Sequence, residues 1–468
     1  MPFAPSAWTT FAYRGVEVSP DGSTITCRYA LLGDDRELPF VETFTLDPGP
    51  ALPPARRDAL HRVARLLWFA AGLSYYKTAA PPVVAVPALT EGERAWLEPL
   101  YREGLGEFAF ENGIDLSRRP VFEEDGEAPG APPATGLGLP RRALVAVGGG
   151  KDSCVSLEVL RGATGAADGA DGVGEVVPFS VGGHRAARDC AAAAGLPLVV
   201  AHRRLDPALG ELNRSGALNG HVPVTAIVSL VAVAQALVTG ADDVVFSNER
   251  SANVGSFVAN GLPVNHQYSK GLAAERRLAT ALAEVTPELS YYSLLRPLSE
   301  VQIAALFARL EPYLPVFTSC NAAFRIEEGR RVERWCGHCP KCRFVFLVLA
   351  PFLPRERLTA IFGKDMLADA AQLQGYRELL GLTGFKPFEC VGEIEESQVA
   401  LVLVARRGLW EGAAVVEALL AELRATAREP GEPQVAAVLT SSGDHELPPH
   451  ALAALTRALR EVEPAVPA

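Results

Sequence analysis

The strongest constraint on the fold is an alternation of short apolar runs and longer helical segments that begins near residue 143. The apolar runs are short enough for buried strands. They are Ala143–Val147, Val176–Phe179, Leu198–Ala201 and Val244–Phe246. The predicted helices between them are Ser153–Leu160, Arg185–Ala194 and Val222–Thr239. Short strands that alternate with helices predict βαβ units and a parallel sheet, so the predicted fold class is α/β.

The rest of the chain is predicted to add a smaller domain before this core and an extension after it. Residues 1–122 contain two strand-like segments and a helical pattern over Arg56–Leu73, which predicts an α+β domain that could contribute to substrate binding. Glu123–Pro140 is rich in Gly, Pro and acidic residues and is predicted to be a linker. The core then covers residues 141–365. Residues 366–468 combine a strand-like run, Val399–Ala405, with helical segments, which predicts an α/β extension.

Composition narrows the classes of function. The chain has 468 residues with 44 basic and 55 acidic side chains, so its net charge is 44 − 55 = −11. This balance argues against a general nucleic-acid binder, which needs a basic surface. The most apolar segment, Val222–Thr239, is interrupted by polar residues and is predicted to be a buried helix rather than a membrane span. With no export signal recognised either, we expect a cytoplasmic protein that acts on a small molecule and forms no disulfides.

A glycine-rich turn follows the first strand of the core. It reads Gly148-Gly149-Gly150-Lys151-Asp152-Ser153 and leads directly into a helix. Glycines let backbone N–H groups approach an anion, and the start of a helix attracts negative charge. Lys151 offers a positive charge and Ser153 a hydroxyl. The turn is not a Walker A loop, because Asp152 stands where Ser or Thr must follow GK. We therefore predict a phosphate-binding loop, with an ordinary strand–helix turn as the alternative.

Polar residues gather between positions 213 and 270, where six of the eight asparagines of the chain lie. Those nearest predicted strand ends are predicted to bind a polar substrate. They are Asn248, Glu249, Arg250, Asn253 and Asn265. The same window holds four candidates for a proton-transferring base: His221, His266, Tyr268 and Lys270. The sequence does not rank these four, and the alternative interpretation is a long solvated loop.

Four cysteines have the spacing of a metal site. Cys336, Cys339 and Cys342 follow one another at intervals of three, and Cys320 lies sixteen residues upstream. Four thiolates in this pattern predict a closed, structural Zn²⁺ site. His338 in place of Cys320, an iron–sulfur cluster, and thiols without metal are the alternatives. The remaining cysteines, Cys154 and Cys190 among them, are predicted to be isolated buried thiols.

The glycine turn resembles the pyrophosphate loop of the PP-loop ATP pyrophosphatases, which reads S-G-G-x-D-S. Gly148 departs from that pattern, because the family has a serine there. The resemblance implies an adenine nucleotide α-hydrolase-like core that binds ATP with Mg²⁺ and cleaves it between the α and β phosphates. In this superfamily the end of the second strand contacts the nucleoside, which corresponds to Ser180 here.

Taken with the cysteine cluster, the chain is similar to the UDP-N-acetylmuramoyl-L-alanyl-L-glutamate epimerases of peptidoglycan precursor synthesis. The segments that carry this resemblance are Ser74–Lys77, Gly148–Ser153, Ser247–Asn253, Asn265–Lys270 and Trp335–Phe346. The resemblance implies that the terminal L-Glu of UDP-MurNAc-L-Ala-L-Glu becomes D-Glu while ATP is converted to AMP and pyrophosphate. An acyl-adenylate would make the α-proton acidic enough for a base to remove.

Two alternative functions follow from the same motifs. One is an ATP-dependent amide or nitrile synthase of the cyano-deazaguanine synthase type, which also combines a pyrophosphate loop with a four-cysteine zinc site. Such enzymes are about half as long as this chain. The other is a nucleotide- and zinc-binding regulatory module without turnover. Entry of solvent deuterium at a substrate Cα would favour the epimerase, and conversion of ATP to AMP would exclude the regulatory module.

Overall fold

The computed structural model describes residues 3–116, 120–130, 132–164, 174–253, 255, 257–259, 262–325, 329, 331–384 and 391–462. The strands are β1 (Thr10–Val18), β2 (Thr24–Gly33), β3 (Arg36–Thr45), β4 (Val83–Pro87), β5 (Val121–Asp125), β6 (Arg142–Ala146), β7 (Glu175–Val181), β8 (Val199–Arg204), β9 (Asp243–Phe246), β10 (Phe257–Ala259), β11 (Leu262–Val264) and β12 (Ser290–Ser293). The helices of the first half are α1 (Pro54–Tyr76), α2 (Glu91–Arg102), α3 (Gly106–Glu111), α4 (Lys151–Arg161), α5 (Arg185–Ala193), α6 (Ala208–Ser215), α7 (Val224–Thr239) and α8 (Leu272–Val285). Those of the second half are α9 (Glu300–Phe307), α10 (Pro340–Leu349), α11 (Arg355–Phe362), α12 (Leu373–Leu379), α13 (Ile394–Arg407), α14 (Ala414–Ala425), α15 (Glu432–Leu439) and α16 (Pro449–Val462).

Ten strands form one mixed, mostly parallel sheet in the order β12-β9-β6-β7-β8-β3-β2-β1-β4-β5. The five strands from β12 to β8 are parallel, which confirms the predicted α/β core. Strand β3 pairs antiparallel with β8 through Thr43–Thr45, so the N-terminal region and the core share this sheet. Strand β5 includes Glu123–Asp125, which lie in the segment predicted as a linker, and pairs with β4.

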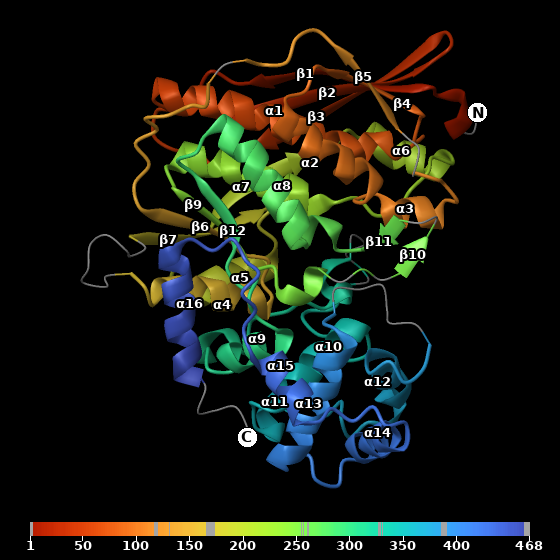
Figure 1. Ribbon diagram of the computed structural model, residues 1–468, viewed down its shortest axis with the longest axis vertical. Coiled ribbons are helices and arrows are strands. Elements are labelled where there is room, and N and C mark those ends of the chain that lie inside the picture. Colours follow the sequence, from red (N-terminus) through yellow and green to blue (C-terminus); the bar gives the residue numbers. More distant parts are fainter. Residues whose placement is uncertain are drawn as a thin grey trace.

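The sheet wraps around helices α1, α2, α7 and α8, which lie between strands β1–β5 and the parallel strands (Figure 1). Helices α4, α5, α9 and α16 cover the opposite face of the parallel strands. Successive strand residues point to opposite faces of the sheet. Val244 and Tyr291 therefore pack in the apolar core that contains α1, α7 and α8, whereas Val245 and Tyr292 pack in the apolar core that contains α4 and α9. Both faces of these strands are therefore buried, which explains their continuous apolar runs.

Helix α1 ends in buried aromatic residues. Ser74–Tyr76 form its last residues, and the rings of Tyr75 and Tyr76 are fully buried in the N-terminal core. Tyr75 stacks on Tyr29, and Tyr76 meets Tyr101 edge to face. These aromatics end the helix against the sheet and fix the place of the following residue, Lys77.

The predicted strand Val399–Ala405 is wrong, because these residues lie inside helix α13. The run of Val and Leu suits a buried strand or a buried helix equally well. Its flanks decide the outcome: Glu393 and Glu396 form a reciprocal cap at the start, and Gly408 ends the helix with φ +66°. The elements described between residues 366 and 462 are helices, so the extension is helical rather than α/β there.

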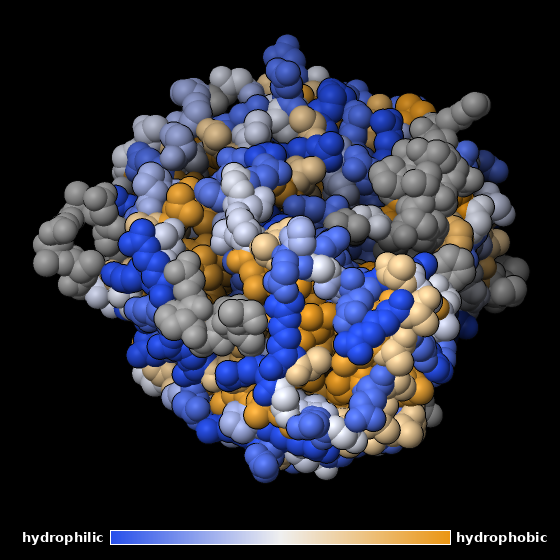
Figure 2. All heavy atoms as spheres, turned by 60° about the horizontal axis from the view of Figure 1, so that its bottom comes forward, coloured by the Kyte–Doolittle hydropathy of each residue, from blue (hydrophilic) through white to orange (hydrophobic). Residues whose placement is uncertain are grey.

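Across the described part of the chain, no helix combines the length and apolar character needed to cross a membrane. Figure 2 shows the face that carries the C-terminal helices. Hydrophilic side chains cover much of it, and hydrophobic side chains show between them in patches on its lower half. Exposed apolar residues of the C-terminal region include Ile394 on α13, Leu452 on α16 and Leu409 in the turn after α13.

Candidate functional site

The glycine turn connects β6 to α4 at the point where the strand order of the parallel sheet reverses. The strands β7 and β8 lie on one side of β6, and β9 and β12 lie on the other. A crevice beyond the carboxyl ends of strands at such a point is the usual place for a ligand in this type of sheet. Gly150 is the N-cap of α4 and offers no side-chain cap, so the first N–H groups of the helix remain available to an anion.

Gly149 is required by both conformation and space. Its φ is +90°, and a Cβ there would lie 2.4 Å from Cβ of Ala186 on α5. Its carbonyl accepts a hydrogen bond from the Thr318 N–H at 2.9 Å. Ser153 donates its hydroxyl to the Gly150 carbonyl at 3.0 Å, which fixes the turn from inside. The turn is thus held against two neighbouring segments.

A cavity of about 600 Å³ lies beside this turn. Ala186 and Thr318, which contact Gly149, belong to its lining, together with His184, Arg185 and Arg334. Its volume is within the range of nucleotide-sized ligands. Ser180, the residue expected at the nucleoside, is buried in β7.

Lys151 is turned into the protein. Its side chain is 3% exposed, and its ammonium forms ion pairs with Asp152 and Glu300. Burial lowers the pKa of Lys151, but the two carboxylates outweigh it and raise the pKa above its usual value. Burial likewise raises the pKa of Glu300, to about 8, against the opposing charge of Lys151. The lysine therefore holds the loop carboxylate and Glu300 together.

The C-terminal extension reaches this ion pair. Glu396 at the start of α13 accepts a hydrogen bond from the Glu300 N–H at 2.9 Å. Burial raises the pKa of Glu396 to about 7. No motif in the last hundred residues predicted that one of them would support the glycine turn.

The residues predicted to bind substrate are largely occupied by protein partners. Asn248 donates to Ser293 Oγ at 2.9 Å, Asn253 accepts from the Leu272 N–H at 2.7 Å, and Asn265 donates to the Ala252 carbonyl at 3.2 Å. Arg250 donates to the Thr440 carbonyl at 3.1 Å. Glu249 is buried beside Ser251 and adds its charge to the surroundings of Glu300. These contacts shape the loops around the sheet edge.

Three of the four candidate bases lie close together. The rings of His221 and His266 are 4.6 Å apart, and the charge of Lys270 acts on His221. Burial, followed by the charge of His266, lowers the pKa of His221 to about 4. His221 is therefore neutral at pH 7 and can accept a proton.

Tyr268 is placed differently from the other three. Its hydroxyl accepts a hydrogen bond from Arg277 on α8, and its ring packs in the N-terminal core. Burial raises the pKa of Tyr268 above its usual value. A phenol held in this way is poorly suited to give up its proton at neutral pH.

Glu107 joins the two imidazoles in this cluster, and it was not among the site residues predicted from the sequence. This residue lies on α3, in the N-terminal region, and its carboxylate contacts Nδ1 of His266. Burial by itself raises the pKa of Glu107, but the hydrogen bond and charge of His266 have a larger, opposite effect. The net pKa is below the usual value, so the carboxylate is ionised. The ligand atoms of Glu107, His221 and His266 lie within 4.8 Å of one another. Two imidazoles and a carboxylate can hold a metal, but the contact at Nδ1 is that of a carboxylate orienting an imidazole.

A buried arginine links this cluster to the segment that follows β9. Arg296 is fully buried and donates to the Glu249 carbonyl at 2.8 Å and to the Lys270 carbonyl at 2.5 Å. Its charge is balanced by Glu275 at 2.9 Å. Arg296 thus ties the segment after β9 to the segment that carries His266 and Lys270.

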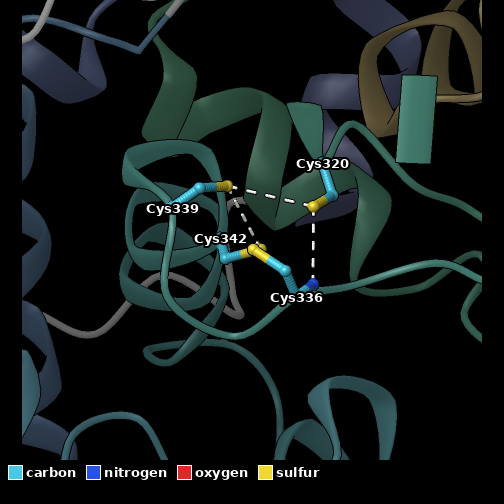
Figure 3. Close-up of side chains that lie close together, drawn as sticks. All are labelled: Cys320, Cys336, Cys339 and Cys342. Carbon is cyan, nitrogen blue, oxygen red and sulfur yellow. Dashed lines mark hydrogen bonds between the residues drawn. The ribbon is translucent and has the colours of Figure 1, made fainter. Parts of the chain in front are cut away.

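The four cysteines predicted as metal ligands converge (Figure 3). Their Sγ–Sγ distances are 3.9 Å for Cys320 and Cys339, 3.7 Å for Cys336 and Cys342, and 3.5 Å for Cys339 and Cys342. A tetrahedron with Zn–S bonds of about 2.3 Å has edges of about 3.8 Å. The Cys336 N–H also donates to Cys320 Sγ at 3.4 Å. The donor set and its spacing fit a zinc ion.

His338 lies outside this set of four. It is exposed, and its Nδ1 is 2.9 Å from the Cys336 carbonyl oxygen. Cys154 and Cys190 are buried free thiols, as predicted, but they are not isolated in the fold, because their Sγ atoms are 3.5 Å apart. Spacing along the chain gave no signal for that contact, which arises where α4 packs near α5.

Comparison with known proteins covers most of the chain. The family model described as the MurL N-terminal domain matches residues 2–294, and that of the MurL C-terminal domain matches residues 316–433. A protein from Salinispora tropica named UDP-N-acetyl-alpha-D-muramoyl-L-alanyl-L-glutamate epimerase is 49% identical over 443 residues, 93% of both chains. Proteins of the same name from a Micromonospora strain and from Xanthomonas oryzae pv. oryzae are 49% and 44% identical, over 90% and 94% of this chain and 92% and 95% of their own. No solved structure matches. The chain therefore belongs to the family of UDP-N-acetyl-alpha-D-muramoyl-L-alanyl-L-glutamate epimerases.

Proposed function

We propose that this protein converts the terminal L-Glu of UDP-MurNAc-L-Ala-L-Glu to D-Glu in an ATP-dependent reaction of peptidoglycan precursor synthesis. The observation that carries this proposal is the likeness, at 44–49% identity over at least 90% of the chain, to three proteins named as this epimerase. The glycine turn and the imidazole–carboxylate cluster support the two chemical steps that such a reaction needs.

The first step is activation of the substrate α-carboxylate. An oxygen of this carboxylate attacks the α-phosphate of ATP, pyrophosphate leaves, and an acyl-adenylate forms. Mg²⁺ would screen the phosphates. In support, the turn at Gly148–Ser153 presents backbone N–H groups at the start of α4, and its motif resembles that of the PP-loop ATP pyrophosphatases. Activation removes the carboxylate charge, so loss of the α-proton no longer creates a dianion.

The second step is proton transfer at Cα. A base removes the proton, the carbanion is delocalised as an enolate, and a proton returns to the opposite face. Water then hydrolyses the adenylate and releases AMP. We assign this step to the cluster of His221, His266 and Lys270, with Glu107 orienting His266. His221 is neutral at pH 7, as a base must be, and the carboxylate of Glu107 orients the ring of His266 through Nδ1.

The test is incubation of the purified protein with UDP-MurNAc-L-Ala-L-Glu, ATP and Mg²⁺ in deuterated water. We expect D-Glu in the product, deuterium at its Cα, and AMP with pyrophosphate. A cyano-deazaguanine-type synthase would consume ATP without deuterium at Cα. Formation of the D-Glu product without ATP would contradict the proposed activation step.

We also propose that Cys320, Cys336, Cys339 and Cys342 hold one structural zinc ion. Elemental analysis of protein purified without chelators should give one zinc per chain. Cys339→Ser should lose the metal and lower the melting temperature and solubility, because the ion joins residue 320 to the start of α10. His338→Ala is the matched control and should keep the zinc. Metal-free wild-type protein would contradict this assignment.

A further inference from the structure

Lys77 carries a buried positive charge that has no anionic partner among the described residues. This residue directly follows α1 and is 7% exposed. The ammonium donates to Oδ1 of Asn219 and to the Gly220 carbonyl at 3.2 Å. Both acceptors are uncharged, and no carboxylate of the described residues forms an ion pair with it. An ammonium has three donors, so one remains after these two bonds.

The two other buried cations among the described residues are neutralised by buried carboxylates, because Lys151 pairs with Glu300 and Arg296 pairs with Glu275. Arg203, whose side chain is partly buried, pairs with the buried Glu42. Burying a charge without a counter-ion is costly. Burial lowers the pKa of Lys77, and no carboxylate of the described residues opposes this shift. Such a site is electrostatically prepared for an anion from outside the chain.

The ammonium faces the imidazole cluster. Its two acceptors, Asn219 and Gly220, immediately precede His221, and its charge helps to lower the pKa of His221. Asn112 at the end of α3 donates to the Asn219 carbonyl at 3.0 Å, and the Leu218 N–H donates to the Thr78 carbonyl at 2.9 Å. The segment that carries His221 is therefore held between the end of α1 and α3.

We propose that Lys77 binds the γ-carboxylate of the terminal glutamate of the substrate and thereby makes the reaction specific for glutamate. This inference rests on the proposed function. In that reaction the α-carboxylate loses its charge on activation, whereas the γ-carboxylate stays anionic from binding to release. Two methylene groups separate the γ-carboxylate from Cα. A cation that binds it must therefore lie close to the cluster that transfers the proton at Cα.

The experiment compares the natural substrate with UDP-MurNAc-L-Ala-L-Gln, in which an uncharged amide replaces the γ-carboxylate. AMP release and deuterium entry at Cα are measured for each. Wild-type protein should prefer the glutamate substrate by about 100-fold in kcat/KM, a ratio typical of one buried charge pair. Lys77→Met should lose this preference, mainly through a higher KM for the glutamate substrate, so that kcat/KM becomes similar for the two substrates. Lys364→Met, which removes a half-exposed lysine paired with Asp369, is the matched control and should keep the preference.

Three results would overturn the proposal. They are equal turnover of both substrates by the wild type, an equal loss with both substrates in Lys77→Met, and an unchanged preference in that variant. An equal loss would instead indicate that Lys77 is the base or a structural residue. The wild-type comparison needs no variant, so it holds even if Lys77→Met folds poorly. Absence of AMP and of D-Glu with the wild type and its natural substrate would refute the proposed function itself.

Discussion

Replacing His266 with alanine is expected to lower deuterium entry at the substrate Cα by about 100-fold or more, the usual contribution of a positioned base. ATP should still be converted to AMP when substrate is present, because activation precedes proton loss. His221→Ala should show the same separation, since the two rings are 4.6 Å apart. The measurements are mass spectrometry of the recovered peptide and chromatography of AMP.

A milder substitution, at Glu107, tests how the ring of His266 is oriented. Glu107→Gln keeps the shape of the side chain but removes the charge that orients Nδ1. We expect a loss of Cα exchange of about tenfold to 100-fold, the range typical when a group that orients another is removed. His61→Ala removes an exposed imidazole of α1 and serves as the control. Normal exchange in both His266→Ala and His221→Ala would contradict the assignment of the proton-transfer step.

The second large effect is expected at the glycine turn. Asp152→Ala and Ser153→Ala should each reduce AMP formation at least about 100-fold, the size of effect typical when one group that organises a charge-stabilising site is removed, while circular dichroism shows an intact fold. Asp152→Ala removes a carboxylate that pairs with Lys151, and Ser153→Ala removes the hydroxyl that fixes the turn. Both residues stand in the first turn of α4, where an anion would meet the helix.

The structure supplies a close control for Ser153→Ala. Ser215 also donates its hydroxyl to the carbonyl three residues before it, at 3.0 Å, but lies on α6 away from the turn. Ser215→Ala should leave AMP formation unchanged. Normal AMP formation by Asp152→Ala would show that this turn does not activate the substrate.

Local signals predicted the core well and the extension less well. The strand, glycine turn and helix around residues 142–161 lie where the pattern placed them, because apolar length and glycine positions act on neighbouring residues. The run at Val399–Ala405 was predicted as a strand, although β-branched residues are also common in buried helices. Its packing against α10 and α15 and its capping residues decided in favour of the helix.

The cysteine cluster shows which contacts the spacing of residues along the chain can predict. Intervals of three place Cys336, Cys339 and Cys342 around one point whatever the rest of the fold does, so the sequence alone identified them. Cys320 also joined them as predicted. In contrast, the contact between Cys154 and Cys190 depends on how two helices pack, and no spacing rule describes that.

By itself, then, the sequence determined the strand–turn–helix unit of the glycine loop, the metal-type spacing of the cysteines, and the family resemblance that the comparisons confirmed. Only the tertiary structure decided that Lys77, Glu107, His221 and His266 lie together. These four residues come from segments far apart in the chain, including α3 and the end of α1, which the sequence assigned to a separate domain. The physical reason is that backbone preferences act over a few residues, whereas the meeting of distant segments is set by which apolar surfaces bury one another, here α1 against α7 and strand β3 beside β8.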